Sequence, residues 1–469
     1  MHKILIIGLF LSLASLEIIS AQATGNYPTD YLSPEFHAGR RAAFREKMSE
    51  NTVAIFFAAQ VRLRNNDVDY QYAQSKNFYY FTGLEEPNSM LILFKSPTTL
   101  LGKTGTDFIF VQNRDPLKEM WTGKILGVDG VKEKYKLENV FTSTQFNASV
   151  FNLKQYDSVL SLFRTEDIFE TYTRSPNELA RMAAIVDSSI KENKQPIAAR
   201  NTMQIMTTLR GVKEPEEISL LEKASIMSCE GHNEVMRAVK PGMKEYQAQA
   251  IMEYFFKKNG SEYPGYPSIN GAAENACVLH YISNLRTMQS GDLLLSDCAA
   301  EYHGYTADIT RTIPINGKFS PEQKLIYELV LAAQDSAIAV CKPGTPFSSI
   351  DETARRVVNR GLIKLGIAAN DAAARTYFPH GTSHHLGLDV HDLGLRGKNP
   401  LVAGNFVTVE PGIYIPPGSK CDQKWWNIGV RIEDDILITK DGNRNLSESS
   451  PRTVAQIEKM AKQQSVFSK

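Results

Sequence analysis

Short apolar runs in the C-terminal half of the chain end in a carboxylate, and this pattern limits how the chain can fold. Residues 293–296 run directly into Asp297, and residues 407–409 run into Glu410. Side chains alternate between the two faces of a strand, so Asp297 would share a face with leucines. A carboxylate at the end of an apolar strand is costly to bury unless it is paired or bound to a metal.

Two further segments repeat the pattern. We expect strands over residues 308–315 and 430–438, which carry Asp308 and Glu433. Arg431 shares a face with Glu433 and could orient that carboxylate. Four acids at strand ends, together with a histidine, suit two divalent metal ions about 3.5–4 Å apart. Oxygen-rich ligands with one imidazole fit manganese, cobalt, iron or zinc and do not select among them.

The histidine is expected from one short segment. Four of the chain's nine histidines fall within residues 378–392: His380, His384, His385 and His391. Glycines nearby favour loops or strand ends, and the H-E-x-x-H helix of zinc proteases is absent from the sequence. His385 is interpreted as structural, and His232 and His303 as ordinary helix or surface residues.

Length and composition indicate a soluble protein of several domains. A chain of 469 residues predicts two or three domains. Its formal net charge of zero argues against a nucleic-acid partner. The N-terminal half alternates strands with short helices, including strands over residues 53–57, 89–94 and 108–111. From Lys213 onward, helices mix with mostly antiparallel strands, so we expect an α+β fold.

The first residues predict export. A short positive start, an apolar stretch and the sequence Ala21-Gln22-Ala23 are typical of a secretory signal peptide over residues 1–23. No later stretch of the sequence is apolar enough to span a membrane. We therefore expect a periplasmic or secreted protein. The five cysteines are odd in number and lack C-x-x-C spacing, which favours free thiols.

Taken together, these motifs resemble those of aminopeptidase P. The first metal motif, the histidine motif and the two glutamate motifs of that family match residues 297–312, 380–392, 408–414 and 431–435. All five ligand positions are filled, in order. Residues 67–83, which end in Phe-Tyr-Tyr-Phe-Thr-Gly, resemble the family's N-terminal domain. Methionine aminopeptidases usually lack that domain, and creatinases lack the metal ligands.

The resemblance implies a fold. A creatinase-like N-terminal α/β domain would precede a C-terminal pita-bread catalytic domain, whose sheet is curved and mostly antiparallel. The expected organisation is a signal peptide over 1–23, an N-terminal domain over 27–185, a helical connector over 186–209, a catalytic domain over 210–456 and a tail over 457–469.

The resemblance also implies a metal centre. Asp308 and Glu433 would bridge two divalent ions, Asp297 would complete one of them, and His384 with Glu410 would complete the other. Manganese is favoured, with cobalt, zinc and iron as alternatives. A hydroxide bridging the ions would attack the carbonyl before proline, with Glu410 as proton shuttle.

Four more residues receive roles from the resemblance. His380 and His391 match positions that hold the substrate carbonyl and the tetrahedral intermediate. His280 matches a histidine that contacts substrate near the scissile bond. Arg431 would support the glutamates and the substrate.

The expected activity is release of the N-terminal residue from peptides with proline in second position. The alternatives are a prolidase, which shares all five ligands, and a non-catalytic peptide-binding protein, which would have lost ligands. Relatives often assemble, so we expect a homodimer or homotetramer, without a nucleic-acid partner and without a membrane span after signal cleavage.

Overall fold

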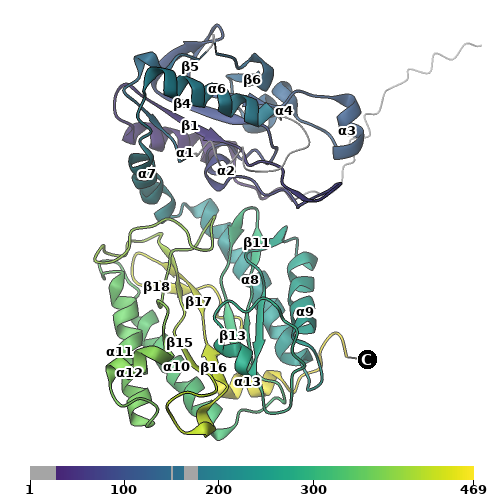
Figure 1. The fold of residues 1–469 in the computed structure, drawn as a ribbon, viewed down its shortest axis with the longest axis vertical. Coiled ribbons are helices and arrows are strands. Elements are labelled where there is room, and N and C mark those ends of the chain that lie inside the picture. Colours follow the sequence, from purple (N-terminus) through teal and green to yellow (C-terminus); the bar gives the residue numbers. More distant parts are fainter. Residues whose placement is uncertain (1–27, 149–150, 163–177, 469) are drawn as a thin grey trace, which may run out of the picture. The chain divides into compact units, whose positions relative to one another are not determined.

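The structure, a computed structural model, describes residues 28–148, 151–162 and 178–468 (Figure 1). The expected signal peptide lies outside these residues. The chain divides into two units after Tyr31, and everything below concerns the unit from Leu32 onward. Across the described ranges, every helix is too short or too polar to cross a membrane.

The N-terminal half is built on one mixed sheet with the strand order β6-β5-β4-β1-β7. Its helices are α1 (Pro34–Lys47), α2 (Lys76–Thr82), α3 (Pro116–Thr122), α4 (Gly127–Tyr135), α6 (Glu178–Asn193) and α7 (Ala199–Gly211). Its strands are β1 (Thr52–Phe57), β2 (Leu63–Asn65), β3 (Val68–Asp69), β4 (Met90–Leu100), β5 (Lys103–Val111), β6 (Val140–Thr142) and β7 (Ser158–Leu160). The three strands expected from sequence in this half are confirmed.

Strand β1 lies inside this sheet and is buried along its whole length. It pairs antiparallel with β4, with Ile55 opposite Ile92, and parallel with β7. A continuous apolar run suits a strand that is covered on both faces. Strands β4 and β5 are joined by Leu101 and Gly102, whose φ angles of 51° and 74° give the left-handed turn that matches the twist of a hairpin.

The C-terminal half combines helices with antiparallel strands. Its helices are α8 (Pro215–Ala238), α9 (Glu245–Lys258), α10 (Pro321–Val340), α11 (Ser348–Lys364), α12 (Asp371–Ala374) and α13 (Val454–Met460). Its strands are β8 (Tyr263–Pro264), β9 (Ile269–Ala272), β10 (Leu293–Asp297), β11 (Ala300–Tyr302), β12 (Tyr305–Thr306), β13 (Thr310–Pro314), β14 (Phe406–Val409), β15 (Gly412–Ile415), β16 (Ile428–Arg431), β17 (Asp434–Ile438) and β18 (Asn443–Asn445). The pairings between these strands are antiparallel, so the expected α+β class is confirmed.

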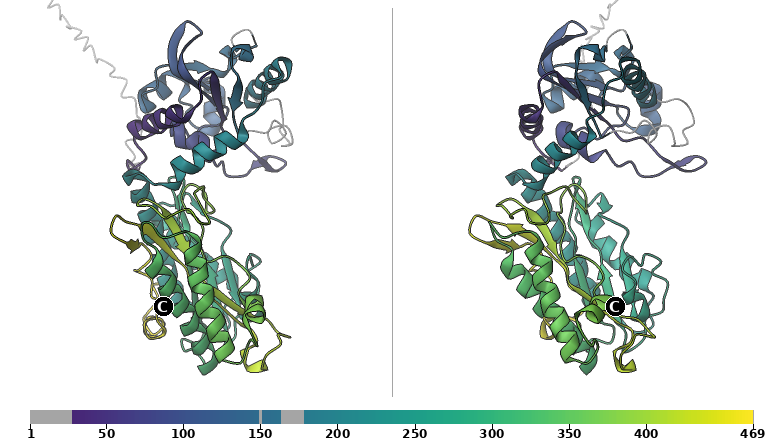
Figure 2. Two further views of the ribbon diagram at one scale, coloured as in Figure 1. Left: turned by 90° about the vertical axis from the view of Figure 1, so that its left-hand side faces the viewer. Right: turned by 60° about the vertical axis from the view of Figure 1, so that its left-hand side comes forward.

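Within this half the strands lie between two pairs of helices. Helices α8 and α9 pack against each other on one side, and α10 and α11 on the other (Figures 1 and 2). Helix α8 begins with Pro215 in its first turn and a capping box between Glu214 and Glu217. Helix α10 begins in the same way, with Ser320 accepting a hydrogen bond from the Gln323 amide.

Two strand predictions are wrong where they meet the acidic residues. The strand expected over 308–315 begins only at Thr310, so Asp308 precedes it. The strand expected over 430–438 is two strands, β16 and β17, which belong to different sheets. Between them, the Ile432 amide donates to Pro411 (3.4 Å) and the Glu433 amide to Thr310 (3.1 Å). These two hydrogen bonds hold the chain where it passes from one sheet to the other, and Glu433 lies at that point.

A buried histidine ties α1 to α2. His37 is 2% exposed, and its Nδ1 lies 3.0 Å from the carbonyl oxygen of Tyr80. Gly83, at φ +68°, ends α2, and a Cβ at this position would lie 2.5 Å from the ring of His37. Burial lowers the pKa of His37 to about 4, although the hydrogen bond to Tyr80 opposes the change. The ring is therefore neutral in the folded protein near pH 7.

This histidine predicts a loss of stability in acid. An unfolded histidine takes up a proton near pH 6.5, whereas folded His37 does so only near pH 4. The contribution of a neutral His37 to the unfolding free energy is therefore fully present above about pH 6.5 and is lost as the pH falls toward 4. A His37→Gln variant keeps a donor for Tyr80 without the titration. Between pH 7 and pH 4.5 we expect it to lose about 2 kcal/mol less unfolding free energy than the wild type, measured by urea unfolding. An equal loss in both proteins would contradict this assignment.

Candidate metal centre

A cavity of about 650 Å³ opens in the C-terminal half. Every residue that the sequence predicts for the site lines it: His280, Asp297, Asp308, His380, His384, His391, Glu410, Arg431 and Glu433. Apolar residues complete part of the wall: Pro267, Ile269, Leu279, Ile282 and Val390. Residues far apart in the sequence thus meet at one place.

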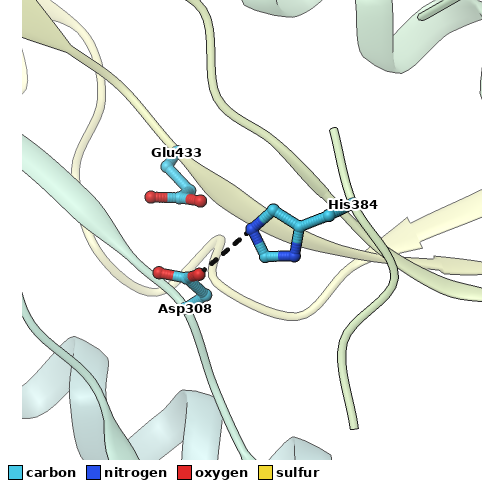
Figure 3. Close-up of side chains that lie close together, drawn as sticks. All are labelled: Asp308, His384 and Glu433. Carbon is cyan, nitrogen blue, oxygen red and sulfur yellow. Dashed lines mark ion pairs between the residues drawn. The ribbon is translucent and has the colours of Figure 1, made fainter. Parts of the chain in front are cut away.

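The centre of this cavity is a cluster of two carboxylates and an imidazole (Figure 3). Asp308, His384 and Glu433 each offer a ligand atom, and these atoms lie within 4.8 Å of one another. The Nε2 of His384 is 3.4 Å from Asp308 Oδ2 and also 3.4 Å from Glu410 Oε1. Its Nδ1 faces the carbonyl of His385 at 3.1 Å. A carbonyl only accepts, so Nδ1 carries a proton, and Nε2 faces the two carboxylates and is the nitrogen that can bind a metal once it gives up its own proton.

Asp297 is joined to Asp308 by a tyrosine. The hydroxyl of Tyr266 lies 2.6 Å from Asp297 Oδ1 and 2.7 Å from Asp308 Oδ1. A tyrosine hydroxyl has one proton to donate, so it satisfies only one of these oxygens at a time. The other oxygen needs a further proton or a cation. This shortage of donors fits a site that is built for metal ions.

Arg431 is the main fixed cation of the site. Its Nη2 donates to Asp297 Oδ2 at 2.6 Å and its Nη1 to the Tyr414 hydroxyl at 2.8 Å. The sequence prediction that Arg431 orients Glu433 holds only indirectly. Arg431 Nε donates to the hydroxyl of Thr310 (3.1 Å), which donates to Glu433 Oε2 (2.6 Å).

In the absence of metal, burial and mutual repulsion disfavour the charged forms of the carboxylates. Burial, with neighbouring carboxylates, raises the pKa of Glu433 well above its ordinary value and that of Glu410 to about 7. Burial also raises the pKa of Asp308. Burial alone would lower the pKa of His384, but Asp308 and Glu410 raise it to about 9. The negative charge exceeds what nearby cations balance, so the donor set fits divalent metal ions.

The remaining predicted histidines lie around this cluster. The ring of His391 is 4.3 Å from that of His384, between centroids, and the pKa of His391 is lowered to about 4 by burial and by His384. His380 has both ring nitrogens occupied, with Nδ1 2.8 Å from the carbonyl of Gly381 and Nε2 2.7 Å from the hydroxyl of Tyr414. Of His380 and His391, only His391 has its ring against that of His384.

The loop that carries the histidines is anchored by a buried ion cluster. Asp392, 2% exposed, accepts from Lys213 Nζ at 2.9 Å and also from Arg210. A Cβ on Gly387 would lie 2.1 Å from the Asp392 carboxylate, so only glycine lets the loop pass this close. His385 binds the carbonyl of Leu395 (2.9 Å) and does not line the cavity, as predicted.

Several contributors were missed by sequence reasoning. Tyr266 and Tyr414 carry no charge, and no sequence pattern assigned either of them to the site. His232 lies in helix α8, in keeping with its interpretation as a helix residue, whereas His303 lies in a turn and is not at the surface; each is 1% exposed. His303 pairs with Glu262 at 2.7 Å.

Comparison with known protein families gives two matches. Residues 37–160 match the family described as Aminopeptidase P, N-terminal domain. Residues 219–440 match Metallopeptidase family M24. The two matches fall in the two halves described above, in the order that the sequence motifs predict.

Individual relatives match over most of their length. The Xaa-Pro aminopeptidase of Escherichia coli K12 is 36% identical over 437 residues, which cover 89% of this chain and 96% of that protein. Human Xaa-Pro aminopeptidase 3 is 31% identical, with coverage of 86% and 79%.

Solved structures agree with these sequence matches. Escherichia coli aminopeptidase P with the inhibitor Pro-Leu superposes with a TM-score of 0.81 at 33% identity, covering 92% of this chain and 98% of that one. Proline aminopeptidase P II from Yersinia pestis gives 0.81 at 32% identity, covering 92% and 99%. The fold and the family implied by the motifs are confirmed, and the chain belongs to the aminopeptidase P family of M24 metallopeptidases, a family of metal-dependent exopeptidases.

Proposed function

We propose that this protein removes the N-terminal residue from peptides whose second residue is proline. One observation carries the proposal: all five predicted ligands line one cavity whose buried carboxylates lack enough protons and cations to balance them. The relatives named Xaa-Pro aminopeptidase and the solved complex with Pro-Leu support the choice of substrate. The apolar wall of the cavity suits a proline ring.

We assign two divalent metal ions to Asp297, Asp308, His384, Glu410 and Glu433. Asp308 and Glu433 would each hold both ions, and manganese would be the physiological metal. When bound, such ions polarise a carbonyl and lower the pKa of water. To compare the candidates, the protein is stripped of metal with a chelator and reloaded with manganese, cobalt, zinc or iron. If the manganese-loaded protein is inactive while another metal restores activity, manganese is rejected as the physiological metal.

Glu410 is the proposed proton carrier. Its Oε2 lies 3.5 Å from His380 Nδ1, and its Oε1 lies 3.4 Å from His384 Nε2. A carboxylate beside the attacking water can accept a proton from it and return that proton later in the reaction. Glu410 would accept a proton from the attacking water and return it to the proline nitrogen as the amide bond breaks.

His391 and His280 are assigned to the substrate carbonyl. His391 is neutral near pH 7, so it has one ring N–H that can donate to an oxygen as negative charge develops there. His280 lies on the same cavity wall. His380 keeps its predicted place, but Tyr414 and Gly381 already occupy its ring. We therefore assign His380 the task of holding Tyr414 and Arg431 in position.

We also propose export to the periplasm or medium, with cleavage after Ala21 or Ala23, and assembly as a homodimer or homotetramer. The signal-like N-terminus supports export. N-terminal sequencing of the mature protein would test cleavage, and light scattering would test assembly. The predicted domain bounds stay predictions, which limited proteolysis can check.

The substrate assignment predicts a preference by peptide length. A Xaa-Pro-Xaa tripeptide should be cleaved more efficiently than the Xaa-Pro dipeptide, because an aminopeptidase must accept the chain beyond proline. Comparing kcat/KM for the two peptides with manganese-loaded protein tests this. Faster cleavage of the dipeptide would indicate a prolidase instead.

Removal of a shared ligand should abolish activity. A Glu433→Ala variant is expected to lose more than about 100-fold in kcat/KM and to bind less than the full complement of manganese, since one carboxylate would hold both ions. A chelator should abolish wild-type activity, and added manganese should restore it. Glu448→Ala, which removes an exposed glutamate, is the matched control and should keep full activity. Full activity in Glu433→Ala would refute the assignment.

A substrate-side histidine should behave differently. His391→Ala is expected to lower kcat by about 10²–10³-fold, the cost of removing one hydrogen bond that strengthens as charge develops. Manganese content should stay at the wild-type level, because His391 is not assigned as a ligand. Metal analysis alongside steady-state kinetics separates the two effects, and loss of metal would contradict this role.

A further inference from the structure

The two aspartates of the centre lie where a strand ladder is interrupted. Strands β10 and β13 pair as far as Asp297, which lies opposite Thr310. Pairing resumes between β11 and β12, which belong to another sheet. Residues 298–299 and 307–309 lie between, and we call these two segments the ladder break. Asp297 borders the break and Asp308 lies inside it, so the ladder alone does not fix their separation.

Few main-chain bonds cross the ladder break. The Cys298 amide donates to Ile309 at 3.2 Å, and the Ala307 amide donates to Ala300 at 3.1 Å. The amide of Asp308 itself donates to the side chain of Asp435, at 3.2 Å to Oδ1. A segment held this sparsely needs support from outside the sheet if its carboxylate is to stay in place.

Helix α8 provides this support from one face. Ser225, Ser228 and His232 follow the i, i+3, i+7 spacing that places residues on one side of a helix, and all three are buried. Ser225 donates to Asp435 Oδ2 at 2.7 Å. Ser228 accepts from the Ala300 amide at 2.9 Å. The three polar side chains of this face bond to the ladder break, to Ala300 directly after it, or to Asp435.

His232 reaches both sides of the break at once. Its Nε2 lies 2.9 Å from the carbonyl oxygen of Cys298 and 3.0 Å from that of Ile309. Carbonyls only accept, so Nε2 carries a proton that the two oxygens share. Cys298 and Ile309 directly follow Asp297 and Asp308 in the chain. One N–H therefore joins the main chain beside one aspartate to the main chain beside the other.

We propose that His232 is a positioning residue of the metal centre, which sets the separation of Asp297 and Asp308 through this shared hydrogen bond. The inference rests on the metal assignment made above. Two metal ions about 3.5–4 Å apart need carboxylates at a fixed spacing. Errors of about 0.5 Å in the placement of such groups are enough to impair a site. His232 does not line the cavity, and its Nε2 bonds go to main-chain carbonyls, so its assigned action on the two aspartates runs through the backbone.

The competing explanation is that His232 simply fills the core. His37 offers a matched control, because it is also nearly fully buried and also bonds a main-chain carbonyl, at 3.0 Å. His37 lies in α1 of the N-terminal half and does not line the cavity. If burial alone matters, substitutions at the two histidines should have the same kinds of effect.

The test compares His232→Leu, His232→Gln, His232→Asn and His37→Leu in the full chain. Manganese dissociation constants are measured by calorimetry on chelated protein, and unfolding free energies by denaturant. His232→Leu should bind manganese about 10–100-fold more weakly, the usual effect of losing a supporting hydrogen bond at a metal site. His232→Gln keeps an N–H of similar reach and should recover most of the affinity, whereas the shorter Asn should not. His37→Leu should lose stability and keep wild-type affinity.

Wild-type affinity in His232→Leu would overturn the proposal. If His232→Leu does not fold, the other two His232 variants decide. Equal manganese affinity in His232→Gln and His232→Asn would overturn the proposal, and weaker manganese binding by His232→Asn alone would support it. The failure of the proposed function looks different. In that case the wild-type protein itself would bind no manganese and cleave no Xaa-Pro-Xaa peptide.

Discussion

The structure of the C-terminal half depends on bringing like charges together out of water. Asp297, Asp308, Glu410 and Glu433 share one cavity, and Arg431 and His384 oppose them at short range. Repulsion and lost hydration act against this arrangement in the metal-free chain, which is why burial raises the pKa values of three of the four carboxylates. The fold has to hold the four carboxylates in place against their mutual repulsion and their loss of hydration.

The fold does so by placing the acids at irregular points of its strands. Asp308 lies in a break of a ladder, Glu433 lies where the chain crosses between sheets, and Glu410 follows the last residue of β14. At these points main-chain groups are free to bond with side chains outside the ladder, such as Asp435. Regular strands would direct the carboxylates to alternate faces. Irregular ones direct them to one cavity, and buried polar residues of neighbouring helices hold the irregular segments.

Much of this could be predicted from sequence, because the ligands are charged residues at the ends of apolar runs. The five ligands, the histidine segment and the start of α8 all carry local signals. The ends of the strands at Asp308 and Glu433 could not be predicted, because they depend on bonds to Asp435 and Thr310 from distant parts of the chain. The roles of Tyr266 and His232 could not be predicted for a similar reason. A neutral side chain gives no sign in sequence of which remote oxygen it contacts.

The distance in sequence between Asp297 and Arg431 affects how the protein folds during its synthesis. These partners are 134 residues apart, with α10 and α11 between them. On a ribosome, the first aspartates therefore emerge long before the arginine and the last glutamate exist. Until then the nascent segment carries carboxylates without their cation and has no reason to bury them. The centre must form as a late, cooperative step, after closure of a long loop. Metal ions can stabilise only the finished domain, so they act on its lifetime rather than on its early assembly.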